Sequence, residues 1–332
     1  MTTNSLRVGI IGTGNTGRRH ARAYGYHKPR THLVACCDLL PESARQFSEQ
    51  FGCEREVSVD SLLARLDVDA VSICTTEPAH LEPVLKAAAA GKHILVEKPM
   101  APDLEQALAM QSAVQASGVK LMVGHLFRFD LRCAGVKEAV DTGRVGRVRS
   151  IDARIHGTPP QQDRIKSYEL PVILFRGCHA IDLMRWYTSS EVVRVYAESV
   201  DGMLRKSGYH SEDATFCLMR FGNGAVGSLE VNSHVPVGHP SAGKSELTII
   251  GTSGMANIDL AMPWFTLASD EGLTYESGDQ KDLWFREQID AFARFVLDDA
   301  PSIATIDDAI AALKVSLAAV ASARAHRPVE IG

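Results

Sequence analysis

The sequence predicts an α/β domain with a doubly wound parallel sheet, followed by an α+β domain with a large, mainly antiparallel open sheet. Three observations lead to this architecture. Short apolar segments alternate with helix-length segments up to residue 124, as in repeated βαβ units. After about Phe127 this rhythm gives way mainly to strand-like segments of alternating pattern. A chain of 332 residues is also longer than an ordinary single domain, so two domains are expected.

The first domain, residues 1–125, contains five apolar segments of the kind that form strands covered by helices on both faces. These predicted strands are Val8–Ile11, Leu33–Cys37, Ala70–Cys74, His93–Val96 and Leu121–Val123. The predicted helices between them are Thr16–His27, Pro41–Phe51, Ser61–Arg65, Leu81–Ala90 and Leu104–Ser117. A parallel sheet with helices on both faces accounts for this order.

The second domain, residues 126–332, is expected to begin with a helix that ends at Asp141. A second helix is predicted over Cys178–Trp186 and a final one over Ile306–Ala325. The predicted strands are Arg147–His156, Glu191–Ser199, Ala214–Phe221, Ala225–Asn232, Glu246–Ile250 and an edge strand at Val329–Ile331. Glycine-rich turns at Gly222–Gly224 and Gly251–Gly254 indicate hairpin connections, which favour an antiparallel sheet.

The composition is that of an ordinary soluble protein, with 45% apolar residues and a net charge of -5. Because lysine and arginine are scattered, we expect no nucleic-acid partner and no membrane contact, and small molecules become the default ligands. No apolar signal segment precedes the first strand, which favours a cytoplasmic location. The seven cysteines form no C-x-x-C pair, so buried thiols and no metal site are expected.

A glycine-rich motif follows the first strand and opens the first helix. It reads Gly12-Thr13-Gly14-Asn15-Thr16-Gly17, and Asp38 ends the second strand 21 residues beyond Gly17. Glycines here allow a tight turn, a close approach of backbone to a pyrophosphate, and close packing of helix on strand. The positive helix N-terminus would hold the phosphates. The motif therefore predicts that the first domain is a dinucleotide-binding Rossmann domain.

The acid at the end of the second strand favours NAD over NADP. Asp38 would accept hydrogen bonds from the ribose hydroxyls, and its charge would repel a 2′-phosphate. Arg18 and Arg19 follow the glycines and could instead reach a phosphate, although a solvated position on the helix is the simpler interpretation.

Four further motifs extend over both predicted domains. They are Thr75-Thr76-Glu77-Pro78-Ala79-His80, Ala90-Gly91-Lys92-His93-Ile94-Leu95-Val96-Glu97-Lys98-Pro99, Gly124-His125-Leu126-Phe127-Arg128-Phe129 and Gly177-Cys178-His179-Ala180-Ile181-Asp182. Together they closely resemble the glucose–fructose oxidoreductase, inositol dehydrogenase and rhizopine-catabolism family of NAD(P)-dependent enzymes. The resemblance implies oxidation of a secondary alcohol of a cyclic polyol, sugar or glycoside, or reduction of the ketone. It also implies a homodimer or homotetramer formed through the sheet of the second domain.

By position, the resemblance implies that Lys98 is the catalytic lysine and that His179 is the histidine of the substrate helix. Lys98 follows the strand that ends at Val96, at the carboxyl edge where doubly wound sheets bind ligands. Hydride transfer from an alcohol needs a group that takes the hydroxyl proton, and a cationic nicotinamide would favour the uncharged amine of a lysine. A cis Lys98–Pro99 peptide bond is possible at this turn.

One position departs from the pattern of the family. Many relatives carry an aspartate four residues before the histidine, and this chain has Phe175 there. Proton transfer then rests on Lys98 and His179, or on a substitute such as Asp163, Arg176 or Tyr168. Phe175 could instead present an apolar face to a sugar ring or an aglycone.

The remaining candidates divide into cofactor and substrate contacts. Cofactor contacts are expected from the glycine motif and from Asp38, Thr75, Thr76, His80, Glu97 and Lys98. Substrate contacts are expected from Lys98, Arg128, Tyr168, Phe175, Arg176 and His179, with Lys166, Asp163 and Arg164 as specificity candidates. A hinge role for Arg128 is an equal alternative. Two alternative functions stay open: a redox-assisted glycosidase or lyase that recycles its NAD, and a non-catalytic NAD-binding sensor.

Overall fold

The computed structural model describes residues 5–159, 166, 168–238, 243–260, 264–269, 272–277 and 283–332. The chain divides into two compact units: Met1–Phe129 with Lys281–Ile310, and Asp130–Gln280 with Ala311–Gly332. The first division lies four residues beyond the expected boundary at residue 125. A later segment then returns to the first unit, which a single boundary does not anticipate.

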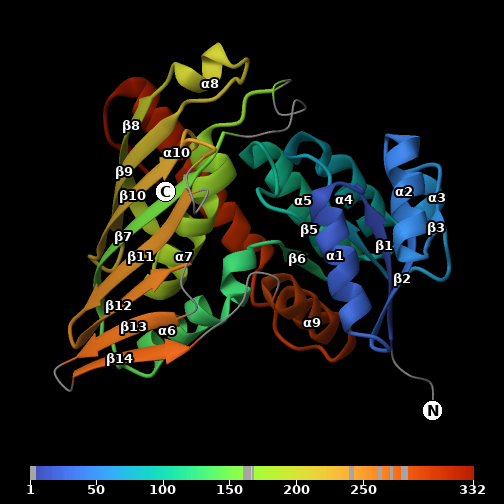
Figure 1. Ribbon diagram of the computed structural model, residues 1–332, viewed down its shortest axis with the longest axis horizontal. Helices are drawn as coiled ribbons and strands as arrows, with labels where there is room; N and C mark the ends of the chain where they lie inside the picture. Colours follow the sequence, from blue (N-terminus) through green and yellow to red (C-terminus); the bar gives the residue numbers. More distant parts are fainter. Residues whose placement is uncertain are drawn as a thin grey trace. The chain divides into compact units, whose positions relative to one another are not determined.

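The first unit contains a six-stranded, fully parallel sheet (Figure 1). Its order is β3 (Glu54–Arg55), β2 (Thr31–Cys37), β1 (Leu6–Ile11), β4 (Ala70–Ile73), β5 (His93–Val96) and β6 (Leu121–Val123). The helices are α1 (Asn15–Tyr26), α2 (Pro41–Phe51), α3 (Val59–Leu63), α4 (Leu81–Ala89) and α5 (Leu104–Ser117). Strand order reverses at β1, and ligands of doubly wound sheets bind beyond the carboxyl ends at such a point. The predicted doubly wound sheet is confirmed, and only the exposed two-residue β3 was not predicted.

Helix α9 (Leu283–Leu297) explains why the late segment belongs to the first unit. Phe285, Ile289 and Phe292 recur at helical spacing and are buried in the same apolar cluster as Tyr24. Burial of each apolar side chain of this size stabilises the folded protein by roughly 1.5–3 kcal/mol relative to leaving it exposed. The spacing was visible in the sequence, but the sheet on which the helix packs was not.

The second unit contains a nine-stranded mixed sheet with one parallel pair, β10 with β7. In spatial order the strands are β14 (Gly272–Ser277), β13 (Trp264–Ser269), β12 (Gly254–Asp259), β11 (Gly243–Gly251), β7 (Val148–Gly157), β10 (Val226–Asn232), β9 (Ala214–Phe221), β8 (Val192–Val200) and β15 (Val329–Glu330). The helices are α6 (Leu131–Asp141), α7 (Cys178–Thr188) and α8 (Met203–Lys206), and α10 (Ile306–Ala325) continues into this unit.

This sheet confirms the predicted α+β architecture. Both predicted hairpins are present, and β15 is an edge strand paired with β8. Strands β12 to β14 extend the sheet beyond the strands that were predicted. Helices α6 and α7 lie on one face of the sheet, and no described helix of this unit covers the other face (Figure 1).

Two further expectations concern the whole chain. All seven cysteines are buried, in line with the expectation of buried thiols. Among the described residues, no helix has both the length and the apolar character that a membrane span requires.

Candidate active site

The glycine motif forms a turn that leaves no space for side chains. Gly12 has φ +96°, and a Cβ there would lie 2.7 Å from the carbonyl oxygen of Cys74. A Cβ on Gly17 would lie 2.2 Å from the carbonyl oxygen of Gly12. Gly14 is the N-cap of α1, and it has no side chain to occupy the first-turn amides. Asn15 and Thr16 begin the helix. A turn of this shape, followed by open amides, fits a dinucleotide pyrophosphate.

The Asp38 carboxylate is fixed at the end of β2. Its Oδ2 accepts hydrogen bonds from the backbone nitrogen and the hydroxyl of Thr13, at 2.7 and 2.8 Å, and its Oδ1 accepts one from the Leu40 nitrogen at 2.9 Å. A carboxylate has about four acceptor positions, so capacity is left for a ribose hydroxyl.

The two arginines after the motif have local partners. Arg18 contacts Gln50 and lies over the Phe47 ring, with 5.7 Å between its Cζ and the ring centroid. Arg19 lies over the ring of Phe285 at 5.5 Å. These contacts account for both side chains without a 2′-phosphate.

A buried polar network lies behind the end of β5. His20 on α1 is fully buried, and its Nε2 is 3.1 Å from Oε1 of Glu97. Its Nδ1 is 3.3 Å from the Ser72 hydroxyl, which is 2.7 Å from the hydroxyl of Tyr24. Burial alone would raise the pKa of Glu97, but the hydrogen bond with His20 and nearby positive charges outweigh it and lower the pKa. Glu97 is therefore held as a carboxylate.

Lys98 follows Glu97 at the carboxyl end of β5. Its backbone nitrogen donates to Oε2 of Glu97 at 3.3 Å, and its peptide bond to Pro99 is cis. A Cβ on Gly124, after β6, would lie 2.8 Å from Oε1 of Glu97, so that carboxylate is confined from both sides. The backbone that carries Lys98 is therefore tied to the helix that begins at the glycine motif.

The residues after β4 shape the same edge of the first sheet. His80 is buried, and its ring nitrogens face the carbonyl oxygens of Met100 at 3.1 Å and of Thr75 at 3.3 Å. Burial lowers the pKa of His80, and a neutral imidazole donates to only one of these carbonyls at a time. The hydroxyl of Thr75 donates to the Ala79 carbonyl at 3.1 Å, and Thr76 precedes the 3₁₀ turn Glu77–Ala79.

Arg128 is bound within the first unit. Its Nη1 donates to the Ile303 carbonyl at 2.7 Å and to Oδ2 of Asp308 at 3.0 Å. Burial alone would raise the pKa of Asp308, but the charge and hydrogen bonds of Arg128 and Thr305 lower it to about 2. These contacts favour a structural role for Arg128 over the predicted substrate contact.

The substrate motif of the second unit is built on a π-helical turn, Ile173–Gly177, that runs directly into α7. Phe175 and Arg176 lie in the turn, and His179 is the second residue of α7. Arg176 donates from Nε to the Ser233 hydroxyl and from Nη2 to the Thr158 carbonyl, both at 2.7 Å. Burial lowers the pKa of Arg176.

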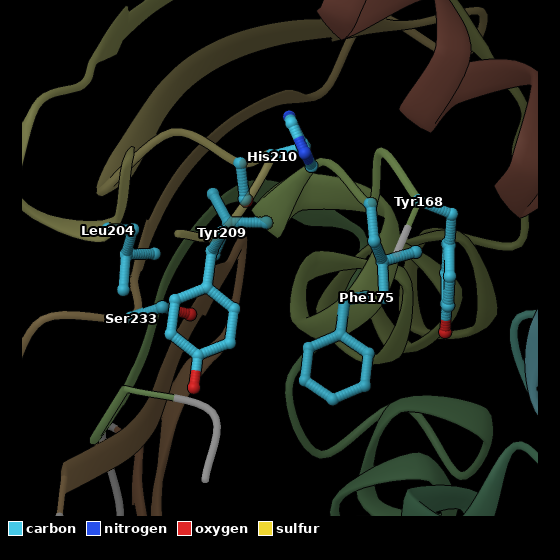
Figure 2. Close-up of a pocket in the computed structure, with 9 residues that line it drawn as sticks. Tyr168, Phe175, Leu204, Tyr209, His210 and Ser233 are labelled. Carbon is cyan, nitrogen blue, oxygen red and sulfur yellow. The ribbon is translucent and has the colours of Figure 1, made fainter. Parts of the chain in front are cut away.

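A solvent-open pocket lies beside this turn (Figure 2). It is lined by Tyr168, Leu170, Val172, Phe175, Leu204, Tyr209, His210, Ser211 and Ser233. The rings of Phe175 and Tyr209 both border the pocket in Figure 2. Tyr168 and Phe175 were predicted to contact substrate, whereas the other lining residues come from separate segments and carry no common motif.

The structure assembles the candidates into two groups, each within its own unit. Glu97, Lys98 and His80 gather at the edge of the first sheet, and Tyr168, Phe175, Arg176 and His179 gather in the second unit. Asp163 and Arg164 lie outside the described residues. The described residues include no group of His, Cys, Asp and Glu that could hold a metal ion. His20, Ser72 and Tyr24 were not identified from the sequence. His20 and Tyr24 are polar residues on the buried face of α1, and their position could have indicated a buried hydrogen-bond network.

Comparison with known proteins matches both units. Residues 6–125 match the model of an oxidoreductase family with an NAD-binding Rossmann fold, and residues 134–257 match the GFO/IDH/MocA C-terminal domain. The chain is 28% identical to scyllo-inositol 2-dehydrogenase (NAD(+)) of Bacillus subtilis (strain 168), over 99% of this chain and 97% of that protein.

Two other similar proteins bear on the substrate and the fold. A 1-carboxy-3-chloro-3,4-dihydroxycyclo hexa-1,5-diene dehydrogenase of Comamonas testosteroni is 31% identical over 69% of this chain and 58% of that protein. The crystal structure of a putative myo-inositol dehydrogenase from Sinorhizobium meliloti 1021 superposes with a TM-score of 0.87 and 25% identity, over 99% of this chain and 100% of that one.

Proposed function

The chain belongs to the GFO/IDH/MocA family of NAD-binding oxidoreductases, and we propose that it oxidises a ring secondary alcohol with NAD, or reduces the corresponding ketone. One observation carries the proposal: the glycine turn, Asp38 and Lys98 follow strands of one parallel sheet at their carboxyl ends. The inositol dehydrogenases among its relatives act on cyclic polyols. The Comamonas relative is named for a carboxylated cyclic diol, which is acidic, whereas inositols are neutral. Because the relatives differ in this way, the charge of the substrate is inferred from this chain's own residues.

Lys98 takes the hydroxyl proton in the proposed reaction. Bound NAD supplies the hydride acceptor. Gly12, Gly14 and Gly17 let the backbone approach the pyrophosphate, and Asp38 accepts from the ribose. Glu97 and His20 act through Lys98 rather than on substrate, because their hydrogen bonds fix the backbone from which the lysine extends.

His179 is the second proposed proton-handling residue. An imidazole can donate to the reacting oxygen or relay its proton to water. Phe175 has no proton to give or accept, so the aspartate found in many relatives is not replaced at its own position. The proposed proton transfer therefore rests on the side chains of Lys98 and His179.

Activity measurements on the purified protein test this function. With NAD and a panel of inositols, hexoses, sugar acids and glycosides, we expect a rise in absorbance at about 340 nm with at least one ring alcohol. No change with any alcohol, or with the matching ketones and NADH, would contradict the proposal. Glycoside cleavage without net NADH would identify the lyase alternative, and NAD binding without any turnover would identify the sensor.

NAD is proposed over NADP. The supporting observation is the fixed Asp38 carboxylate, whose charge opposes a 2′-phosphate. We expect Asp38→Ala to weaken NAD binding about tenfold while NADP binding is unchanged or improves, because a charge-assisted hydrogen bond and a repulsion are both removed. Fluorescence titration with both cofactors measures this. Tighter NADP than NAD binding in the wild type would contradict the assignment.

We also propose that copies of the chain associate through the uncovered face of the second sheet. Phe216 and Leu218 on β9 are 51% and 62% exposed, and Val226 and Ile250 share one row across β10, β7 and β11. Exposed apolar patches of this kind typically mark interfaces. Light scattering should show a dimer or tetramer that Leu218→Arg dissociates, whereas Leu108→Glu on α5 leaves it intact. A monomeric wild type would contradict this proposal.

A cytoplasmic location is proposed for the enzyme. Seven buried thiols are typical of a protein from a reducing compartment. Fractionation of expressing cells tests the location, and recovery of the enzyme outside the cytoplasmic fraction would contradict it.

A further inference from the structure

We propose that Arg176 binds a carboxylate on the ring of the alcohol substrate, so that the enzyme prefers acidic cyclic alcohols to neutral polyols. This inference rests on the proposed function, whose substrate class it narrows. It begins from a cation whose hydrogen bonds to the described residues all go to neutral groups. The Arg176 guanidinium donates to the hydroxyl of Ser233 and to the Thr158 carbonyl.

The described residues place no carboxylate within 4.0 Å of this guanidinium. Burial also lowers the pKa of Arg176, and no acid offsets that effect. A charge removed from water without an opposite charge is costly, and buried charges in proteins are normally paired. An anionic ligand would supply the missing pair.

The position of Arg176 links it to the pocket. Its Nε is bonded to Ser233, and its Cζ lies 5.5 Å from the centroid of the Phe175 ring; both residues line the pocket (Figure 2). A Cβ on Gly157 would lie 2.1 Å from Nη1, so the guanidinium rests directly against the backbone of β7. His179 follows three residues later in the chain.

The acids nearest to the pocket in sequence have hydrogen-bond or ion-pair partners other than Arg176. Glu212 accepts from the Val172 nitrogen at 2.8 Å and from the Thr215 hydroxyl at 3.1 Å, and burial raises its pKa. Glu169 pairs with Arg324. None of the nine lining residues is acidic, and Nζ of Lys166 lies 5.1 Å from the centroid of the Tyr209 ring. The described side chains that line this pocket therefore carry no negative charge.

The chemistry of the pocket points to a carboxylate on a ring. A guanidinium and a carboxylate form paired, parallel hydrogen bonds, whereas a hydroxyl of a neutral polyol gives a single weaker one. Phe175, Tyr168 and Tyr209 line the pocket and offer apolar ring faces to a ligand. An aspartate in place of Phe175 would neutralise Arg176 and repel the ligand. With phenylalanine at position 175, the Arg176 guanidinium can instead pair with a substrate carboxylate.

A paired substrate series tests the proposal. Two sources could supply such an acid: a hexuronic acid and a carboxylated cyclohexadiene diol. The series compares D-glucuronate with D-glucose, and a carboxylated cyclohexadiene cis-diol with the unsubstituted diol. For one pair we expect kcat/KM to favour the acid by about 100-fold, the effect of pairing a buried charge. The pair that shows this preference identifies the source.

Substitution of Arg176 locates the effect. Arg176→Gln should abolish the preference for the acid, so that kcat/KM of the acid falls to that of its neutral partner, while Arg176→Lys should keep part of the preference. The matched control is Arg194→Gln on β8, an exposed arginine with Glu330 at 3.8 Å. Equal rates for acid and neutral partners in the wild type, or an equal loss for both in Arg176→Gln, would overturn the proposal.

A binding measurement separates this inference from the proposed function. Calorimetry with D-glucuronate and with benzoate, in the presence of NAD, should show at least about tenfold weaker binding to Arg176→Gln than to the wild type. If no alcohol is oxidised but this difference is found, the proposed function fails and the anion site stands. Binding that is absent or equal in both proteins overturns the anion site. If the variant does not fold, the acid and neutral pairs in the wild type decide.

Discussion

The two groups of candidate residues differ in how their charges are paired. In the first unit, Glu97 is bonded to His20, and Asp308 to Arg128, so each buried acid has a protein partner. In the second unit, the described residues give Arg176 hydrogen bonds only to a hydroxyl and a carbonyl oxygen. These two acids of the first unit are paired within the protein, whereas Arg176 is proposed to pair with an anionic substrate.

This difference follows from what each side has to do. A cofactor that is common to a whole family can be met by a preorganised site of backbone amides and internally paired acids, at no cost of rearrangement. Specificity for a substrate depends on the difference between its affinity and that of its competitors. A buried charge without an opposite charge discriminates strongly, because every ligand that leaves it unpaired binds more weakly. Four predictions test this contrast.

The largest expected effect concerns Lys98. Lys98→Ala should lower kcat by about 100-fold or more, because general-base groups typically contribute that much, while NAD affinity is kept. Stopped-flow turnover and cofactor titration measure the two quantities. Lys86→Ala, on the surface of α4 and paired with Asp60, is the matched control. Full activity of Lys98→Ala would remove the lysine from the mechanism.

The second prediction tests the preorganised turn. Gly17→Ala places a Cβ against the Gly12 carbonyl, so we expect the strain to weaken NAD binding or lower stability by about 1–3 kcal/mol. Gly25→Ala on the same helix meets nothing within 4 Å and should leave NAD binding unchanged. Calorimetry with NAD and thermal unfolding compare the pair. Equal behaviour of the two variants would show that the turn tolerates side chains.

The third prediction tests internal pairing. The folded pKa of Asp308 is about 2, below its usual 3.8, so its pairing stabilises the protein at and above about pH 4 and is lost as pH falls through about 2. Asp308→Asn should therefore lower the free energy of unfolding by about 2 kcal/mol at pH 7. In denaturant titrations from pH 7 to pH 2, the difference in free energy of unfolding between the wild type and Asp308→Asn should become smaller below about pH 4. A gap independent of pH would contradict the assignment.

The smallest expected effect concerns the unpaired side. Arg176→Gln should change the free energy of unfolding by less than about 1 kcal/mol, because two neutral hydrogen bonds are lost while an uncompensated buried charge is removed. The same denaturant titration at pH 7 measures it. If Arg176→Gln lowered the free energy of unfolding as much as Asp308→Asn, the proposed difference in charge pairing between the two units would be contradicted.

Much of the first unit could be predicted because its signals are local. Apolar strands, the glycine motif and the acid at the end of the second strand each depend on residues close in sequence, and the parallel sheet follows from their order. Lys98 could be placed at a sheet edge for the same reason. The association of α9 with this sheet could not be predicted, because its apolar stripe shows that it packs but not on what.

The sequence by itself determined the doubly wound sheet, the dinucleotide turn and the edge at which Lys98 lies, since hydrophobic period and glycine conformation act over a few residues. Tertiary structure alone decided that His20 is bonded to Glu97, and that Phe175 shares a pocket with Tyr209 and Ser233. The physical reason is distance along the chain. Contacts between segments tens of residues apart depend on how whole elements pack, and so the charge state of the substrate side emerged only with the fold.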